Sequence, residues 1–372
     1  MPDPPQRRVG LVVNPIAGIG GAVGLKGSDG DGLAERARRL GGTSPAAGRA
    51  RAVLEAVRDL GTSVPLLTGA AELGAGHVPA GFVHHCAVGG RPDTPSTAAD
   101  TVRVARELVA AGVDLLVFVG GDGTARDVLD AVGAQVPVLG IPAGVKMHSA
   151  VFATTPRRGA EVIAAFVRGE TTSVAREVMD IDEEQIRQGR VSARLYGVLQ
   201  VPDQPRLLQR AKVGSRGGTD VPGIAAQIAS EMHDDVRYVL GPGTTVQAVA
   251  DQLGVESSLL GIDVVHGAEL VGQDVSEQTL FSLVQGGPCR IIVAVTGGQG
   301  YVLGRGNPQI SPRVIRSVGP VHLQIVATMD KLLALDGPLR VDTGDDVLDR
   351  ELSGYRRVTT GYRRETMWMV AS

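Results

Sequence analysis

The sequence contains only two cysteines, Cys86 and Cys289, among its 372 residues. That number is too small for a disulfide framework or a cysteine-based zinc site. Apolar runs such as 115–119 and 291–295 are strand-sized, and none approaches the ~20 residues that a bilayer-spanning helix needs. The first ten residues carry proline and arginine but no apolar segment of a secretion signal. We therefore expect a cytoplasmic protein without a membrane partner.

A surplus of charge of one sign is also missing. The 37 basic and 40 acidic side chains leave a formal charge of −3, which argues against a polybasic nucleic-acid binder. Lysine occurs only four times and asparagine only twice, at Asn14 and Asn307. Glycine is abundant instead, with 51 residues, about twice the usual ~7% share. A lysine or asparagine inside a glycine loop is therefore less expected by chance.

The first part of the chain alternates between apolar strands and amphipathic helices. Strands are predicted at 8–13, 64–67, 115–119 and 136–141, and helices at 46–60, 96–111 and 124–132. Such alternation implies right-handed crossovers and a doubly wound parallel sheet. We expect residues 1–156 to form this α/β domain.

The composition of the sequence changes after a helix predicted near 157–168. The segments 174–182, 190–201 and 206–213 are rich in valine and arginine and alternate roughly between apolar and polar residues, which predicts a small β-rich insert. We place this helix and insert at 157–230. Strand–loop–helix alternation then resumes, so 231–372 is expected to form a second α/β region that ends in a β-like tail.

The strongest motif is the run Gly120-Gly121-Asp122-Gly123-Thr124, which lies between a buried strand and a helix. A helix N-terminus at the carboxyl end of a parallel strand favours anions, and glycines let phosphates approach the backbone. A carboxylate among phosphates suits phosphoryl transfer, where it orients and deprotonates the attacking hydroxyl. The structural alternative is an aspartate that caps the helix while the glycines only turn the chain.

Two more glycine loops follow predicted strands of the same sheet. The first is Asn14-Pro15-Ile16-Ala17-Gly18-Ile19-Gly20-Gly21, and ligands of open α/β sheets bind at this edge. The second is Gly140-Ile141-Pro142-Ala143-Gly144, followed by Val145-Lys146-Met147-His148. Asn14, Gly18, Gly20, Gly21, Gly144 and Lys146 are therefore candidate phosphate or nucleotide contacts. For His148 a phosphate contact and a structural role are both open.

These motifs together resemble the superfamily of NAD kinases, diacylglycerol kinases and sphingosine kinases. The strings NPIAGIGGAVGLKGSDG, GIPAGVKMHSAVFA and GGQGYVLGRGNPQISPRVIR resemble more closely a family of ATP- or polyphosphate-dependent NAD kinases that includes proteins similar to the acetoin catabolism protein X. The resemblance implies an enzyme that uses a divalent cation, Mg²⁺, to phosphorylate the 2′-hydroxyl of NAD. It also implies that Asp122 is the general base and that Gly120, Gly121, Gly123 and Thr124 hold phosphates.

The sequence departs from both groups of relatives in the motifs for the acceptor. The Asn-Glu or Asn-Asp pair of NAD kinases is missing, because neither asparagine of this chain precedes an acid. The Gly-Thr and Asn-Asp of the lipid kinases are replaced by Gly144-Val145 and Met147-His148. A kinase of another small-molecule or lipid hydroxyl, or a non-catalytic protein that binds NAD or nucleotides, therefore stays open.

Glycine loops in the second half supply further candidates. They are Gly243-Thr244-Thr245, at a predicted helix start, Gly298-Gln299-Gly300, and the segment with Arg305 and Asn307. Arginine binds phosphate in a bidentate manner, although such loops are often plain turns. Five glycine loops fit a donor and an acceptor that both carry phosphates. We also expect a homo-oligomer.

Several other polar groups are discounted, and no metal ligands are assigned. The run His84-His85-Cys86 lacks a second ligand pair at usable spacing. The acidic residues at 180–184 and 342–349 are expected to be solvated ends of structural elements rather than Mg²⁺ ligands.

Overall fold

The computed structural model describes residues 6–25, 32–80, 82, 85–90, 96–144, 147–181, 193–204, 207–208, 220–335 and 337–372. The chain forms two compact units. The first comprises 1–19, 28–34 and 43–211, and the second comprises 20–27, 35–42 and 212–372. The three-part division expected from the sequence stays a prediction, and each unit is described by itself.

The first unit is built on a five-stranded parallel sheet with the order β3-β2-β1-β4-β5. The strands are β1 (Val9–Val13), β2 (Leu66–Gly69), β3 (His85–Val88), β4 (Leu115–Gly120) and β5 (Val138–Pro142). All residues of β1, β4 and β5 are buried, as expected for central strands covered on both faces. This confirms the doubly wound parallel sheet.

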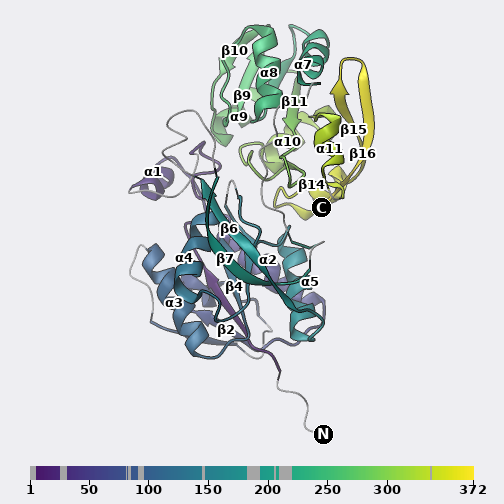
Figure 1. The fold of residues 1–372 in the computed structure, drawn as a ribbon. Coiled ribbons are helices and arrows are strands. Elements are labelled where there is room, and N and C mark those ends of the chain that lie inside the picture. The colour runs from purple at the N-terminus through teal and green to yellow at the C-terminus, as the bar shows by residue number, and fades with distance from the viewer. Residues whose placement is uncertain are drawn as a thin grey trace. The chain divides into compact units, whose positions relative to one another are not determined.

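Helices cover both faces of this sheet (Figure 1). The helices α2 (Ala46–Asp59) and α5 (Pro156–Val167) pack against each other, as do α3 (Ala98–Ala110) and α4 (Asp122–Val132). Local signals explain where they begin. The Asp100 carboxylate accepts from the Thr97 backbone N–H before α3, and Thr155 caps α5 ahead of Pro156. Short 3-10 turns, η1 (Ala71–Leu73) and η2 (Ala75–His77), follow β2.

The core of this unit is densely packed around the site-bearing strands. Phe118 on β4 and Phe152 meet edge to face with ring centroids 5.3 Å apart, and both are fully buried. Gly140 on β5 lies beneath the Phe152 ring, where any side chain would collide with it. Burial of large apolar side chains under β4 and β5 holds the ends of these strands in place.

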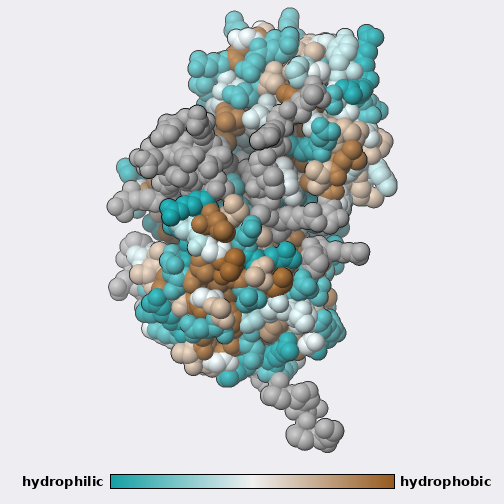
Figure 2. Space-filling model, in the orientation of Figure 1, coloured by the Kyte–Doolittle hydropathy of each residue, from teal (hydrophilic) through white to brown (hydrophobic). Residues whose placement is uncertain are grey.

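The antiparallel pair β6 (Ser173–Ile181) and β7 (Ala193–Pro202) also belongs to the first unit. This pair is the part of the expected β-rich insert that lies among the described residues. Leu199 and Val201 are buried, whereas Leu195 and Val198 are about half exposed. Figure 2 shows apolar side chains on the visible face of this unit, in the region where Figure 1 draws β6 and β7.

The second unit contains a nine-stranded mixed sheet with the order β10-β9-β8-β11-β13-β15-β16-β14-β12. Its strands are β8 (Arg237–Leu240), β9 (Asp263–His266), β10 (Glu269–Gly272), β11 (Cys289–Ala294), β12 (Tyr301–Leu303), β13 (Leu323–Val326), β14 (Leu339–Val341), β15 (Gly354–Gly361) and β16 (Arg364–Ala371). β8, β11, β13 and β15 run parallel to one another. β16 is antiparallel to β15, and β14 and β12 run parallel to β16.

Helices bury apolar residues on both faces of this sheet as well. One core lies under α7 (Val221–Ser230) and α8 (Thr244–Leu253). The other lies under α9 (Glu277–Val284), α10 (Pro312–Val318), α11 (Met329–Leu333) and α12 (Asp346–Leu352). Two further elements are α1 (Leu33–Arg39) and the 3-10 turn η3 (Pro320–His322). The second α/β region is thus confirmed.

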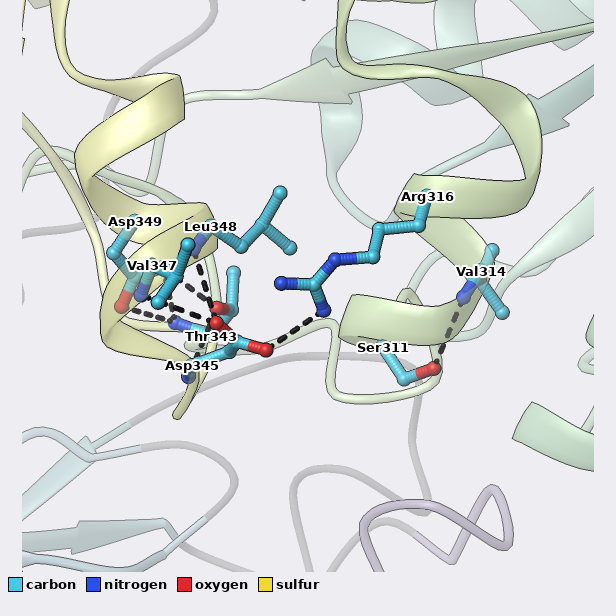
Figure 3. A network of polar contacts seen from close by, with 8 residues as sticks. All are labelled: Ser311, Val314, Arg316, Thr343, Asp345, Val347, Leu348 and Asp349. Atoms are coloured by element: carbon cyan, nitrogen blue, oxygen red, sulfur yellow. Dashed lines mark hydrogen bonds and ion pairs between the residues drawn. The ribbon is translucent and has the colours of Figure 1, made fainter.

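The tail, expected to be β-like, contains the helix α12 between β14 and β15. Asp345 accepts hydrogen bonds from the backbone N–H groups of Val347 and Leu348, and Arg316 of α10 pairs with the same carboxylate at 2.7 Å (Figure 3). The N-cap and the ion pair therefore start a helix in a segment of mostly β-like residues. Among the described residues, no helix is long and apolar enough to cross a bilayer.

Candidate active site

Three glycine loops of the first unit follow neighbouring parallel strands. Asn14 comes after β1, Gly121-Asp122 after β4, and Ala143-Gly144 after β5. β1 and β4 are adjacent, and the strand order reverses between them. Open α/β sheets bind ligands at this point, outside the carboxyl ends of the strands. The geometry thus brings the three loops to one edge of the sheet.

Direct contacts lock these loops together. The Asn14 side-chain amide donates to the Thr124 hydroxyl at 2.9 Å, and the Ala143 N–H donates to the Gly120 carbonyl at 2.8 Å. Gly18 has a positive φ of 71°, and a side chain there would collide with the Ala143 carbonyl. These glycines therefore permit close approach of backbone to backbone.

Gly121 and Gly144 show the same close packing between the second and third loops. A Cβ atom on Gly144 would lie 2.9 Å from the Gly121 Cα atom. Gly121 is also the N-cap of α4, and no side chain caps the helix there. The first turn of α4 therefore presents backbone N–H groups and the positive end of its dipole beside the loops.

Asp122 is the first residue of α4, and it is only 5% exposed. Oδ2 accepts the His148 backbone N–H at 2.6 Å and lies 3.2 Å from His148 Nδ1. Oδ1 accepts the Ser149 N–H at 3.0 Å and lies 2.6 Å from the Ser149 hydroxyl. The carboxylate is thus held by two consecutive residues of the loop after β5.

Ser149 connects this carboxylate to β6. Its hydroxyl oxygen accepts the Met179 N–H at 3.0 Å and lies 2.7 Å from the Met179 carbonyl oxygen. Two residues earlier on β6, the Glu177 carbonyl accepts the Ala150 N–H at 2.9 Å, so residues 149–150 contact the backbone of this strand at two points. One fully buried serine therefore joins α4, the loop after β5 and β6.

The next charged pair lies one helical turn further along α4. Arg126 is 2.9 Å from Asp180, which directly follows Met179 on β6. The ion pair connects the same two elements that Ser149 bridges. His148, which the sequence left open between a phosphate contact and a structural role, is 2% exposed and contacts Asp122.

Some predicted residues lie outside this cluster. Gly20 and Gly21 belong to the second unit, where the nearby Ala22 carbonyl accepts the Glu277 N–H at 2.7 Å. Lys146 lies outside the described residues. The Asn14 loop is therefore divided between the two units, with Asn14 and Gly18 in the first.

The second unit places its candidate loops at two edges of its sheet. Gly243-Thr244-Thr245 follows β8 and Gly298-Gln299-Gly300 follows β11, and these strands are parallel neighbours. Gly243 is the N-cap of α8, and a Cβ atom at this position would lie 3.9 Å from the side chain of Ala294 at the end of β11. These two loops therefore share one edge of the sheet.

Arg305 and Asn307 follow β12, which runs in the opposite direction to β11, so they lie toward the other edge. Arg305 is 5% exposed, 3.4 Å from the Asp342 carboxylate and stacked 4.5 Å above the Tyr301 ring. The Asn307 amide donates to the Val302 carbonyl at 2.8 Å. Both side chains contact their own unit in this structure.

The described part of the chain contains no group of three or more His, Cys, Asp or Glu side chains placed to hold a metal. Both Asp122 oxygens already accept hydrogen bonds, and Asp180 is paired with Arg126. The described residues therefore do not form a protein-built Mg²⁺ site. The expectation that the acidic residues at 180–184 and 342–349 are solvated is wrong for Asp180, Asp342 and Asp349, which are buried by their partners. Asp345 caps α12, and residues 182–184 lie outside the described residues.

Ser149 and Met179 are the site residues that sequence reasoning missed. The only available signal was the position of Ser149 in a polar run soon after a glycine loop. Its partner Met179 is 30 residues away on β6, and no local pattern connects the two residues.

Comparisons with known proteins identify two family domains in the chain. Residues 9–171 match the ATP-NAD kinase N-terminal domain, and residues 233–370 match the ATP-NAD kinase C-terminal domain. No curated protein matches the chain. A solved diacylglycerol kinase from Bacillus anthracis str. Sterne is 18% identical over 48% of each chain, with a TM-score of 0.24. Another structure with that assignment, from the same organism, is 17% identical over 48% of this chain and 46% of its own, with a TM-score of 0.26. The chain thus spans about half the length of these solved structures.

Proposed function

Because the chain belongs to the ATP-NAD kinase family, we propose that it transfers a phosphoryl group from ATP or polyphosphate to the 2′-hydroxyl of NAD, giving NADP. Membership of the family supports kinase chemistry. The choice of NAD as the acceptor is a more specific proposal. The observation that carries the proposal is the position of Asp122. It is the only carboxylate in the Gly120–Thr124 loop, and it lies at the N-terminus of α4 beside two other glycine loops.

The phosphates of the donor are assigned to the three loops of the first unit. The candidates are Asn14, Gly18, Gly120, Gly121, Gly123, Thr124 and Gly144, and Lys146 follows them in sequence. Free N–H groups and the helix dipole stabilise the phosphate charge that shifts during transfer. Phosphoryl transfer needs positioning and charge neutralisation more than covalent participation by the protein.

A divalent cation is part of the proposal. Mg²⁺ keeps several waters and binds through one or two carboxylates together with substrate phosphates. Since the described residues form no ready-made metal cage, the donor phosphates are its main ligands. When bound, the ion neutralises phosphate charge. Residues of this chain orient the phosphates and the acceptor hydroxyl.

The glycine loops of the second unit are further candidate phosphate or nucleotide contacts. Gly243, Thr244, Thr245, Gly298, Gln299 and Gly300 supply a helix N-terminus and turns at one sheet edge. Arg305 and Asn307 remain candidates for the same ligand at the other edge. We further propose that the protein is a cytoplasmic homo-oligomer that binds neither nucleic acid nor a membrane.

A lipid hydroxyl is the second candidate acceptor, and one observation favours it. The first unit exposes apolar side chains on β7, where Leu195 is 55% and Val198 is 51% exposed. Exposed apolar residues in one patch often mark a contact surface for a partner or a lipid. An acyl chain would therefore have an apolar strand to contact beside the network of Asp122.

The test is a competition of acceptors. Purified protein is incubated with Mg²⁺, γ-³²P-ATP and either NAD or diacylglycerol in mixed micelles, and labelled product is separated. We expect label in NADP at a rate at least tenfold above that in lipid. Label in phosphatidic acid alone would replace NAD by the lipid, and no label in either product would favour a non-catalytic nucleotide-binding protein. Replacement of ATP by polyphosphate identifies the donor.

A further inference from the structure

The Ser149 hydroxyl has more hydrogen-bond acceptors within reach than it has protons. A hydroxyl carries one donor proton and two acceptor positions. Ser149 Oγ lies 2.6 Å from Asp122 Oδ1 and 2.7 Å from the Met179 carbonyl, and it also accepts the Met179 N–H at 3.0 Å. While Asp122 is ionised, neither the carboxylate nor the carbonyl carries a proton, so only one of these two oxygens receives the Ser149 proton at a time.

Hydrogen-bond donors surround the Asp122 carboxylate. An ionised carboxylate offers about four lone-pair positions. With the Ser149 proton turned toward it, Asp122 accepts from two backbone N–H groups, the His148 ring and the Ser149 hydroxyl. Once Oδ1 carries a proton it needs an acceptor instead, and Ser149 Oγ lies 2.6 Å away.

We propose that Ser149 is a positioning residue whose hydroxyl rotates between Asp122 and the Met179 carbonyl and thereby becomes the acceptor for Oδ1 when Asp122 takes the proton of the acceptor hydroxyl. This inference rests on the proposed function, because it assigns a role within the same reaction. With the proton on the Met179 side, Ser149 Oγ turns a lone pair toward Oδ1. Ser149 keeps a hydrogen bond in both orientations, so the rotation leaves no buried donor unpaired.

The chemical step then balances without a proton from Ser149. The O–H bond of the acceptor breaks, its proton forms an O–H bond with Asp122 Oδ1, and the oxygen lone pair attacks the terminal phosphorus. The bond between that phosphorus and the bridging oxygen breaks, and the electron pair leaves with ADP. The protonated Oδ1 donates to Ser149 Oγ, which still donates to Met179, and the proton passes to water after product release.

The charged groups near Ser149 are paired with one another or with Asp122. His148 contacts Oδ2 from the loop after β5, and the pair of Arg126 on α4 and Asp180 on β6 lies one turn further on. Because Arg126 and Asp180 compensate each other, the Ser149 hydroxyl is the group beside Oδ1 that changes its donor direction.

Kinetics with substituted proteins test the role. We expect S149A to lower kcat for NADP formation by about 10- to 100-fold, the effect of one lost charge-assisted hydrogen bond. KM for NAD and for ATP should stay within about twofold, because Ser149 is fully buried and its hydroxyl bonds to Asp122 and Met179. S149T keeps a hydroxyl and should recover most of the lost kcat.

The matched control is T154V, which deletes another buried hydroxyl of the same unit, bonded to the Leu207 carbonyl at 3.2 Å. We expect wild-type kcat from T154V. A kcat within twofold of wild type in S149A, or equal losses in S149A and T154V, would overturn the role of Ser149. Absence of turnover in the wild-type protein would instead count against the proposed function.

Neutron diffraction tests the rotation without turnover. In the wild-type protein at neutral pD, the Ser149 deuteron should point to Asp122. In D122N the amide places a donor where a protonated carboxyl would place one, so the deuteron should point to the Met179 carbonyl. The same orientation in both proteins, or a deuteron on Met179 in the wild type, would overturn the proposal.

Discussion

The side chains of Asn14 and Thr124, 110 residues apart in sequence, are joined by a hydrogen bond of 2.9 Å. The bond ties the loop after β1 to the first turn of α4. Asn14 Oδ1 also accepts the Ile16 N–H at 3.2 Å, so one side chain shapes its own loop and holds the neighbouring one. This pair fixes the relative position of the two strand ends between which the strand order reverses.

Replacing Thr124 by valine should therefore weaken the site at nearly constant volume. T124V removes the acceptor of the Asn14 amide, and Thr124 is only 3% exposed, so water cannot replace it. We expect the free energy of unfolding to fall by about 1–2 kcal/mol and KM for the phosphoryl donor to rise. T124S keeps the hydroxyl and is the control. Urea denaturation and steady-state kinetics measure both effects, and equal behaviour of the two variants would refute the contact.

Gly18 and Gly48 form a matched pair for the same substitution. G18A places a side chain at positive φ against the Ala143 carbonyl, and we expect a loss of stability of about 2 kcal/mol. Gly48 lies within α2 with open space around it, so G48A should stabilise the protein by about 0.5–1 kcal/mol. Denaturant midpoints compare the two. A denaturant midpoint of G18A equal to that of the wild type would show that the two loops are not in contact.

Asp345 predicts a pH dependence of stability. The ion pair with Arg316, together with the N–H groups of Leu348 and Val347, lowers the pKa of Asp345 from 3.8 to about 2 (Figure 3). Since the unfolded chain binds this proton more readily, the contribution to stability is complete above about pH 4 and disappears as the pH falls to about 2.

Substitutions of Asp345 measure that contribution. D345A should lower the free energy of unfolding at pH 7 by about 1 kcal/mol, the usual value of an N-cap. D345N keeps a capping oxygen and should lose less. The difference between wild type and D345N should shrink as the pH falls from 4 to 2. If the difference in the free energy of unfolding does not change with pH, the ion pair with Arg316 does not contribute to stability.

The two cysteines should react at very different rates. Cys86 is exposed, whereas burial raises the pKa of the Cys289 thiol to about 11. At pH 8 we expect one thiol to react rapidly with a chromogenic disulfide reagent and the second only after unfolding, because the thiolate is the reactive form. C86S should abolish the rapid phase. Two rapidly reacting thiols in the folded wild-type protein would contradict the burial of Cys289.

Much of this architecture could be predicted from sequence where one local pattern suffices. The apolar run of β4 and the Gly120–Thr124 loop place Asp122 at a helix start. The alternation of strands and helices predicted the parallel sheet, because buried central strands have continuous apolar sequences.

Features that depend on distant partners could not be predicted. The helix α12 begins with the help of Arg316, 29 residues away from Asp345, inside a segment of β-like residues. The contact of Asp122 with Ser149 depends on how the loop after β5 folds over α4, and the bridge to Met179 depends on how residues 149–150 lie along β6. The assignment of Gly20 to the second unit likewise follows from packing rather than composition.

The most direct measurement is the initial rate of NADP⁺ formation by wild-type protein and D122N. Each is incubated with NAD, Mg²⁺ and ATP or polyphosphate, and the product is read through an NADP-specific dehydrogenase. Because an amide brings N–H groups toward the His148 and Ser149 donors, the folded fraction and nucleotide binding of D122N are measured in parallel. We predict turnover by the wild type and none by folded, nucleotide-binding D122N. Undiminished turnover by D122N would contradict the assignment of Asp122, and no NADP⁺ from the wild type with either donor would contradict NAD as the acceptor.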